Sequence, residues 1–235
     1  GFTTDMQVGD VDGDGDTDVV VPKGISTGES VWWYENPRPS GDPTTDGWTE
    51  HEIGVGVAHD LEVGDVDGDG RLDVVVRGGN TTLFLQSERD TWTRVGLSAR
   101  PEEGVALGDL DGDGDLDVAI NAYWLENPLP EGDPAADPWP EHGVDADGTE
   151  RVGAEVVDLN GDGRLDIAYS ASESPGRLAW YAAPEDPVDG AWTEQVVDPS
   201  VDYVHTFESA DVDLDGDVDL VTAEMEKSDD PDEVS

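Results

Sequence analysis

Five short acidic loops carry the residues whose types and spacing can do chemistry. Each copy follows the template Asp-x-Asp-x-Asp-Gly-x-x-Asp, and one copy has Asn at its third position. Oxygen ligands at positions 1, 3 and 5, a glycine at position 6 and a backbone carbonyl at position 7 are how an EF-hand loop begins to bind Ca²⁺. We therefore predict a hard-cation site in each loop. The copies span residues 10–18, 65–73, 109–117, 158–166 and 211–219.

Calcium is the cation that these loops favour. Clustered carboxylates repel one another, and a flexible set of about six to eight oxygens suits Ca²⁺ better than Mg²⁺. The chain has no Cys, so no soft ligand competes. The alternative is a set of solvated acidic turns, but such turns need neither Asp at fixed odd positions nor Gly at the sixth. Asn160 removes one charge from the fourth loop, which we expect to bind more weakly, and Leu214 replaces a glycine of the fifth, which disfavours the same turn.

The loops recur at a regular spacing that predicts the architecture. Their first Asp residues are 55, 44, 49 and 53 residues apart, and a period of about 40–50 residues with four short strands is typical of propeller blades. In each unit one strand precedes the loop, a β-branched strand follows it, the third is aromatic and the fourth begins with Trp. No loop has the Glu at position 12 that an EF-hand needs.

We therefore predict an all-β fold, a β-propeller of four-stranded antiparallel blades that forms a single domain over residues 1–235. The expected blades span residues 4–54, 59–97, 103–145 and 150–198, with an incomplete fifth over 204–235.

With these repeats the chain resembles the FG-GAP (also called VCBS) repeat proteins, which include the propeller heads of integrin α-subunits. The resemblance covers nearly the whole chain. It implies a seven- or eight-bladed propeller with Ca²⁺ between the first two strands of each repeat, and thus up to five ions here. Four and a half blades predict a fragment whose partners are the remaining blades of the parent chain; a five-bladed ring closed by another pairing is the alternative.

The resemblance also implies the ligand set, with the seventh position of each loop acting through its backbone carbonyl. The predicted calcium ligands are Asp10, Asp12, Asp14, Asp16, Asp18, Asp65, Asp67, Asp69, Arg71, Asp73, Asp109, Asp111, Asp113, Asp115, Asp117, Asp158, Asn160, Asp162, Arg164, Asp166, Asp211, Asp213, Asp215, Asp217 and Asp219.

The charge of the chain bears on its surroundings. The formal net charge is −47, from 58 acidic and 11 basic residues, and a net charge of −25 would remain without the 22 aspartates of the loops. We interpret this excess as adaptation of a halophile to high salt, where the Debye length falls to about 3 Å at 1 M. Such a surface disfavours nucleic acid as a partner, and no apolar stretch is long enough to span a membrane. Calcium and the family resemblance predict an extracellular or cell-surface setting.

Two classes of function fit these features. The favoured one is a non-catalytic, calcium-stabilised scaffold that binds a glycan or protein ligand. The alternative is a propeller-fold polysaccharide lyase or sugar dehydratase with its active site on the face opposite the calcium loops. No Ser-His-Asp motif, zinc motif or phosphate-binding glycine loop supports the enzyme, and no catalytic residue is assigned.

Two histidines at equivalent positions are the candidates for the enzymatic alternative. His59 and His205 each lie six residues before the first Asp of a loop, where the third repeat has Glu103. Imidazoles and a carboxylate at a channel mouth can bind a transition metal or transfer protons. The supporting candidates are Tyr123, Arg77 and Arg151. The remaining histidines, His51 and His142, each follow a Trp by three residues and are interpreted as outer-strand residues that pack or lie exposed.

Overall fold

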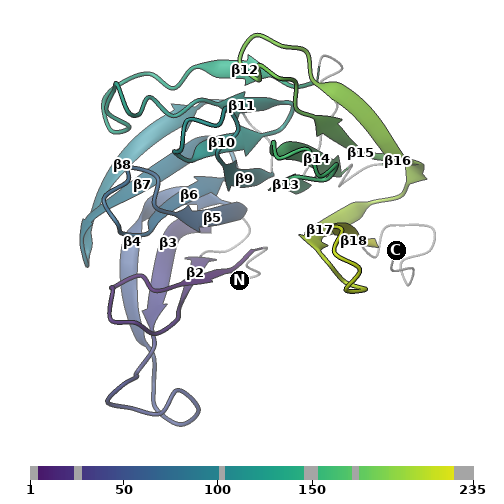
Figure 1. The fold of residues 1–235 in the computed structure, drawn as a ribbon. Coiled ribbons are helices and arrows are strands. Elements are labelled where there is room, and N and C mark those ends of the chain that lie inside the picture. The colour runs from purple at the N-terminus through teal and green to yellow at the C-terminus, as the bar shows by residue number, and fades with distance from the viewer. Residues whose placement is uncertain (1–4, 24–27, 101–103, 146–152, 171–174, 225–235) are drawn as a thin grey trace. The chain divides into compact units, whose positions relative to one another are not determined.

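The computed structural model describes residues 5–23, 28–100, 104–145, 153–170 and 175–224. Within those ranges every helix or strand is a β-strand (Figure 1). The strands form four four-stranded sheets and one two-stranded sheet, and each sheet is antiparallel. The predicted all-β class and its four-stranded antiparallel units are confirmed.

The chain divides into two compact units. The first comprises Gly1–Pro101 and Pro128–Trp139, and the second comprises Glu102–Asn127 and Pro140–Ser235. That the chain forms a single domain with the blade limits given above stays a prediction.

The first unit contains two sheets whose strands pair in chain order. Sheet 1 consists of β1 (Gln7–Gly9), β2 (Asp18–Lys23), β3 (Gly28–Glu35) and β4 (Thr49–Ala58). Sheet 2 consists of β5 (Asp60–Gly64), β6 (Asp73–Arg77), β7 (Thr81–Glu88) and β8 (Thr91–Ser98).

The second unit contains the other three sheets, again with strands in chain order. Sheet 3 consists of β9 (Val105–Gly108), β10 (Asp117–Ile120), β11 (Tyr123–Leu125) and β12 (Glu141–Gly143). Sheet 4 consists of β13 (Gly153–Val157), β14 (Asp166–Ser170), β15 (Gly176–Ala182) and β16 (Thr193–Val201). Sheet 5 consists of β17 (Val204–Ala210) and β18 (Asp219–Glu224). In every sheet an acidic loop joins the first strand to the second.

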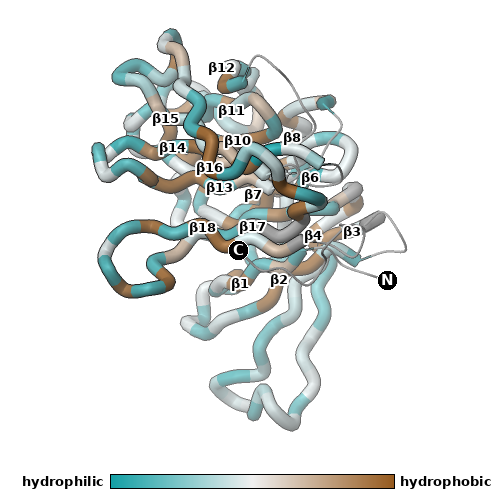
Figure 2. The backbone as a smooth tube through the Cα atoms, turned by 90° about the vertical axis from the view of Figure 1, so that its right-hand side faces the viewer, coloured by the Kyte–Doolittle hydropathy of each residue, from teal (hydrophilic) through white to brown (hydrophobic). Residues whose placement is uncertain are grey.

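The core of the first unit lies between its two sheets. Val20, Val31 and Trp33 of sheet 1 are fully buried, and they belong to one cluster with Val74 and Phe84 of sheet 2. β-Branched and aromatic side chains pack well on pleated surfaces, which is why these runs form strands. Figure 2 shows that hydrophobic residues are concentrated along strands, whereas the long connection after β3 is mostly hydrophilic.

The core of the second unit is built in the same way. Trp124 of sheet 3 belongs to one buried cluster with Ile167, Tyr169 and Tyr181 of sheet 4. The Tyr169 hydroxyl donates a hydrogen bond to the carbonyl of Ile120 at 2.7 Å, which satisfies its polar end inside the core.

A smaller buried cluster links sheet 4 to sheet 5. Ala168 and Leu178 form its centre, and Trp180 of β15 packs against it. Leu220 of β18 packs against the same cluster, so the last strand of sheet 5 contacts sheet 4 through an apolar side chain.

The tryptophans expected to open the fourth strands mostly lie outside them. Trp48, Trp139 and Trp192 precede β4, β12 and β16, and only Trp92 lies within its strand, β8. The indole N–H of each of the first three donates to a proline carbonyl five residues earlier, at 3.3, 3.2 and 3.3 Å. These hydrogen bonds close the Pro- and Asp-rich loops, so the three side chains stabilise the loops before the fourth strands and are not part of those strands.

Candidate metal centres

Three carboxylates converge in four of the five loops. In each group one oxygen from each of positions 1, 3 and 9 lies within 4.8 Å of the other two. Carboxylate oxygens at this spacing are the hard donors that Ca²⁺ prefers. The structure thus brings together three of the predicted side-chain ligands per loop. The groups are Asp10, Asp12 and Asp18; Asp65, Asp67 and Asp73; Asp109, Asp111 and Asp117; and Asp211, Asp213 and Asp219.

A shared pattern of backbone hydrogen bonds holds the loops in one conformation. In all five, the ninth-position carboxylate accepts the N–H of position 2 at 2.8–3.0 Å. The first-position carboxylate accepts the N–H of the glycine at position 6 at 2.9–3.1 Å. The third-position side chain accepts the N–H of position 5 at 2.8–3.2 Å. Both ends of each loop are therefore tied to the side chains that would hold the ion.

The ninth-position aspartates also tie the loops to their sheets. Asp18, Asp73, Asp117 and Asp166 are at most 1% exposed. The second oxygen of each accepts a backbone N–H from the end of the third strand or the residues that follow it, at 2.8–2.9 Å. Each carboxylate therefore connects an acidic loop to the third strand of its sheet or to the residues that follow it. In sheet 5, whose described part has two strands, Asp219 keeps the contact within the loop.

Burial changes the proton affinity of these carboxylates. It raises the pKa of Asp73 to about 7 and that of Asp117 to about 8, despite backbone N–H groups that favour the charged form. Burial together with the neighbouring Asp113 charge raises the pKa of Asp115 to about 7. A divalent cation favours ionised ligands, so its binding would release protons from these loops near neutral pH.

The fifth-position carboxylates do not belong to the described three-carboxylate groups. Each accepts the N–H of position 7 instead, at 2.9–3.2 Å. In the second and fourth loops the seventh residue is an arginine, and Arg71 and Arg164 form ion pairs with Asp69 and Asp162. Calcium ligation by position 5 and by the position-7 carbonyl stays a prediction.

The two loops with unusual sequences keep the shared conformation. Asn160 accepts the N–H of Asp162 through its side-chain oxygen at 2.8 Å, as the other third-position residues do through a carboxylate. The fourth loop therefore differs mainly in charge. In the fifth loop Leu214 has a φ of 63° where the other loops have glycine, so the turn that its side chain disfavours forms nonetheless.

Polar residues on the outer strands lie close to the first and third loops. His51 stacks on Trp33 with ring centres 4.1 Å apart, and its Nε2 lies 3.0 Å from Glu35. His142 and Trp124 repeat the stack at 4.4 Å, as part of the same arrangement with Glu126. The side chains of the two histidines are 17% and 14% exposed. They pack, as one of the two interpretations expected. Their acidic partners, Glu35 and Glu126, were not predicted. The Glu-Asn-Pro sequence that starts at the last residue of β3 and directly after β11 is the signal that could have found them.

The candidates for the enzymatic alternative are only partly described. His59 is half-buried, with Nδ1 3.5 Å from the Asp60 carboxylate. Arg77 is fully buried at the end of β6 and donates a hydrogen bond to the Thr81 hydroxyl at 3.1 Å, while Tyr123 is half-buried in β11. Glu103, Arg151 and the side chain of His205 lie outside the described residues. Their convergence on one pocket therefore stays a prediction.

No helix long and apolar enough to cross a membrane occurs among the residues that the structure describes.

A solved structure shares this fold. It is that of a lectin from Agrocybe aegerita, described by its specific recognition of non-reducing terminal N-acetylglucosamine. The likeness has a TM-score of 0.55 and 15% sequence identity, and it covers 92% of this chain and 59% of the lectin chain. This chain therefore spans less than two thirds of the lectin chain. None of the curated proteins compared with the chain matches it.

The sequence repeats match a known family. The model of the FG-GAP-like repeat matches residues 10–76, 65–120 and 158–222, which together make up more than half of the chain. Each matched segment begins at the first Asp of an acidic loop and ends in a strand that follows such a loop. The four-stranded antiparallel sheets are consistent with the propeller blades that the sequence predicts. The chain belongs to the FG-GAP-like repeat family.

Proposed function

We propose that the chain is a calcium-stabilised scaffold of propeller blades that binds a glycan or protein ligand. The observation that carries this proposal is the convergence of three carboxylates in the loops that join the first two strands of sheets 1, 2, 3 and 5. No catalytic step is assigned to these residues. Their part is to hold the ion and, through the ninth-position aspartate, to connect it to the sheet.

The residues of these loops fit a divalent cation. In the second loop, Asp65 Oδ1 is buried and accepts no hydrogen bond in the described structure. A buried carboxylate oxygen without a donor is unfavourable, and a cation at the centre of each group would satisfy it. The donors are hard oxygens, which favours Ca²⁺ over softer metals. A bound ion would supply positive charge that removes the repulsion among the carboxylates.

The setting that we propose is extracellular or at the cell surface, and rich in salt. Calcium loops suit the high calcium concentration outside cells. The net charge of −47 exceeds what five divalent ions can offset, and dissolved salt would screen the remainder.

The remaining blades of a longer protein are the partners that we propose for sheet 1. Val8, Val19 and Tyr34 share one face of this sheet, because Val8 pairs with Val19 and Val19 with Tyr34. The equivalent residues of sheet 2 are Val63, Val74 and Phe84, which pack in the buried cluster that contains Trp33. Val8, by contrast, is 53% exposed. A further repeat would cover the face of sheet 1 as sheet 1 covers that of sheet 2.

A glycan is the first ligand class to test, because the lectin of similar fold recognises a terminal sugar. The experiment is a glycan array probed with the chain in Ca²⁺ and again after calcium removal. We expect binding to a defined set of glycans that is lost with calcium. An assay for unsaturated sugar products on the glycans that bind tests the lyase alternative. Formation of unsaturated sugar products would contradict the proposal of a non-catalytic scaffold. The proposal would also be contradicted if the array showed no specific glycan binding and the chain captured no protein ligand.

A further inference from the structure

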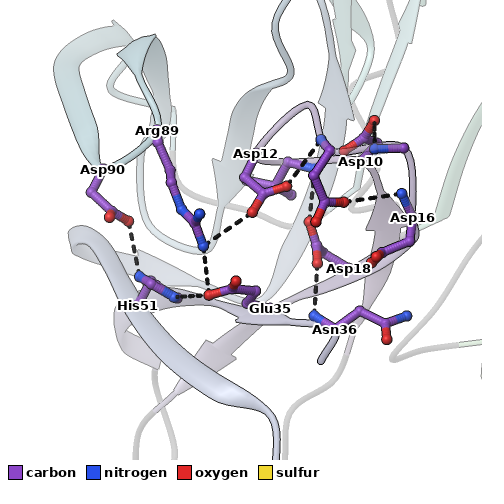
Figure 3. A network of polar contacts seen from close by, with 12 residues as sticks. Asp10, Asp12, Asp16, Asp18, Glu35, Asn36, His51, Arg89 and Asp90 are labelled. Atoms are coloured by element: carbon purple, nitrogen blue, oxygen red, sulfur yellow. Dashed lines mark hydrogen bonds and ion pairs between the residues drawn. The ribbon is translucent and has the colours of Figure 1, made fainter. Parts of the chain in front are cut away.

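Arg89 places a positive charge at the first metal loop. It lies in the turn between β7 and β8 of sheet 2, and its Nη2 is 3.0 Å from Asp12 Oδ2 and 2.5 Å from Glu35 Oε2 (Figure 3). Asp12 is one of the three converging carboxylates of that loop. A residue of sheet 2 thus contacts a candidate cation ligand that belongs to sheet 1.

The Asp12 carboxylate has few other ways to balance its charge. Its side chain is 1% exposed, so water does not solvate it. One oxygen accepts the N–H of Asp14 at 3.2 Å, and the other, Oδ2, accepts no hydrogen bond in the described structure. The guanidinium of Arg89 is therefore the main counter-charge of this carboxylate when no metal ion is bound.

Surrounding side chains hold Arg89 in position. Its guanidinium carbon lies 5.5 Å from the centre of the Trp33 ring, and Trp33 stacks on His51. His51 in turn lies 3.0 Å from Glu35 on one side and 3.0 Å from Asp90 on the other, as Figure 3 shows. Glu35 offers the guanidinium a second acidic partner if a cation takes Asp12.

The first loop differs in this respect from the others. In the other four loops, no ion pair joins a basic side chain to the third-position residue among the residues that the structure describes. The arginines of the second and fourth loops pair with the fifth position of their own loop instead. Asp67 of the second loop is thus matched to Asp12 in position and chemistry but lacks the arginine.

We propose that Arg89 is a built-in counter-cation of the first loop, which neutralises Asp12 in the metal-free protein and competes there with Ca²⁺. The inference rests on the proposed calcium function. It has two consequences. The first loop binds Ca²⁺ more weakly than it would without Arg89, and calcium binding there is coupled to the contact between the β7–β8 turn and sheet 1. Arg89 acts through the Asp12 carboxylate and is not itself a calcium ligand.

The physical basis is the repulsion between like charges. A guanidinium in contact with a ligand carboxylate repels a divalent ion at that carboxylate, and partial burial limits screening by salt. Removing the positive charge should therefore raise the calcium affinity of the first loop by about fivefold, while the metal-free protein loses the charge balance of Asp12.

The test is a calcium titration of the whole chain followed by NMR, with the backbone amides of Gly15 and Gly70 reporting on the first and second loops. Arg89→Gln should lower the calcium midpoint at Gly15 about fivefold, leave that at Gly70 unchanged and lower the melting temperature without metal. Arg89→Lys keeps the charge and should stay near the wild-type midpoint, which separates charge from packing. Arg94→Gln, an exposed residue of β8 that contacts the Thr82 hydroxyl, is the control and should change neither midpoint.

The outcomes separate this inference from the proposal on which it rests. A Gly15 midpoint that stays the same or rises in Arg89→Gln, while Gly70 titrates normally, would overturn the role of Arg89 alone. If neither glycine responds to Ca²⁺ in the wild-type chain, the calcium function fails and this inference fails with it.

Discussion

Leu214 occupies a backbone conformation that the other loops reserve for glycine. Its φ is 63°, and its side chain is 86% exposed, so the strain of the left-handed conformation has no packing gain to offset it. That conformation costs a residue with a Cβ about 1 kcal/mol. We expect Leu214→Gly to stabilise sheet 5 by about 1 kcal/mol, measured as slower hydrogen exchange of the β17–β18 amides.

The reverse substitution is the matched control. Gly161 occupies the same position of the fourth loop, with a φ of 72°, and a Cβ added there would meet no atom within 4 Å. Gly161→Leu should therefore destabilise sheet 4 by about the same amount through backbone strain alone. Equal exchange rates in wild type and Leu214→Gly would contradict the account.

The buried ninth-position carboxylates make metal-free stability depend on pH. Burial raises the pKa of Asp117 to about 8 and that of Asp73 to about 7, above the values of these groups in the unfolded chain. The folded state then binds more protons than the unfolded state between about pH 4 and pH 8, so stability falls as pH rises through that window. We expect the metal-free chain to melt at a higher temperature at pH 5 than at pH 8.5, and Ca²⁺ to reduce the difference.

A variant isolates this effect from the net charge. Asp117→Asn removes the titrating group and should flatten the pH dependence of the melting temperature without metal. Asp189→Asn removes one charge from an exposed position and should leave the slope nearly unchanged. Equal slopes in the two variants would show that Asp117 does not carry the effect.

At the scale of single residues, the sequence identified the converging carboxylates but not their supports. Asp at fixed odd positions with Gly at the sixth has a local cause, and local patterns are visible in the chain. The second contact of Asp18, with the N–H of Asn36, and that of Asp12 with Arg89 join residues 18 and 77 positions apart. No spacing rule predicts such contacts, because they depend on how strands and sheets pack.

At the scale of elements, the strands that a local pattern encodes could be predicted, and those that depend on other contacts could not. The β-branched runs after each loop form β2, β6, β10 and β14 as expected, because alternating or continuous apolar residues suit half-buried and buried strands. The starts of the fourth strands were less predictable. Trp48 has a high strand preference, but its indole N–H donates to the carbonyl of Pro43 in the preceding loop, and this contact within the loop outweighs the strand preference.

The exposed face of sheet 1 gives a prediction at this scale. Val8 is 53% and Met6 58% exposed, an apolar surface that we expect a further repeat to cover. At about 1 M salt, where charge repulsion is screened, the chain of 235 residues should self-associate through this face, as measured by sedimentation velocity. Val8→Lys should weaken the association, whereas Val212→Lys, at a 61% exposed position in the fifth loop, should not. Equal association in both variants would place the contact elsewhere.

At the scale of the whole molecule, the dominant feature is the net negative charge. Five calcium ions would offset about ten of the 47 net negative charges, so salt must screen the rest. We expect the melting temperature to rise with NaCl between about 0.1 M and 2 M and to fall on addition of a chelator at any salt concentration. Circular dichroism that does not change in salt-free buffer with chelator would contradict both expectations.

Equilibrium dialysis against Ca²⁺ at high ionic strength tests the central claim most directly, since it counts the ions that the loops hold. We predict saturable binding that approaches five ions per chain, with the fourth loop, which has Asn160, among the weakest. Asp67→Ala in the second loop removes the third-position oxygen ligand altogether, so it should lower the count by one and leave the fold intact. Binding that does not saturate, or a count that is the same in wild type and Asp67→Ala, would contradict the assignment of these loops as calcium sites.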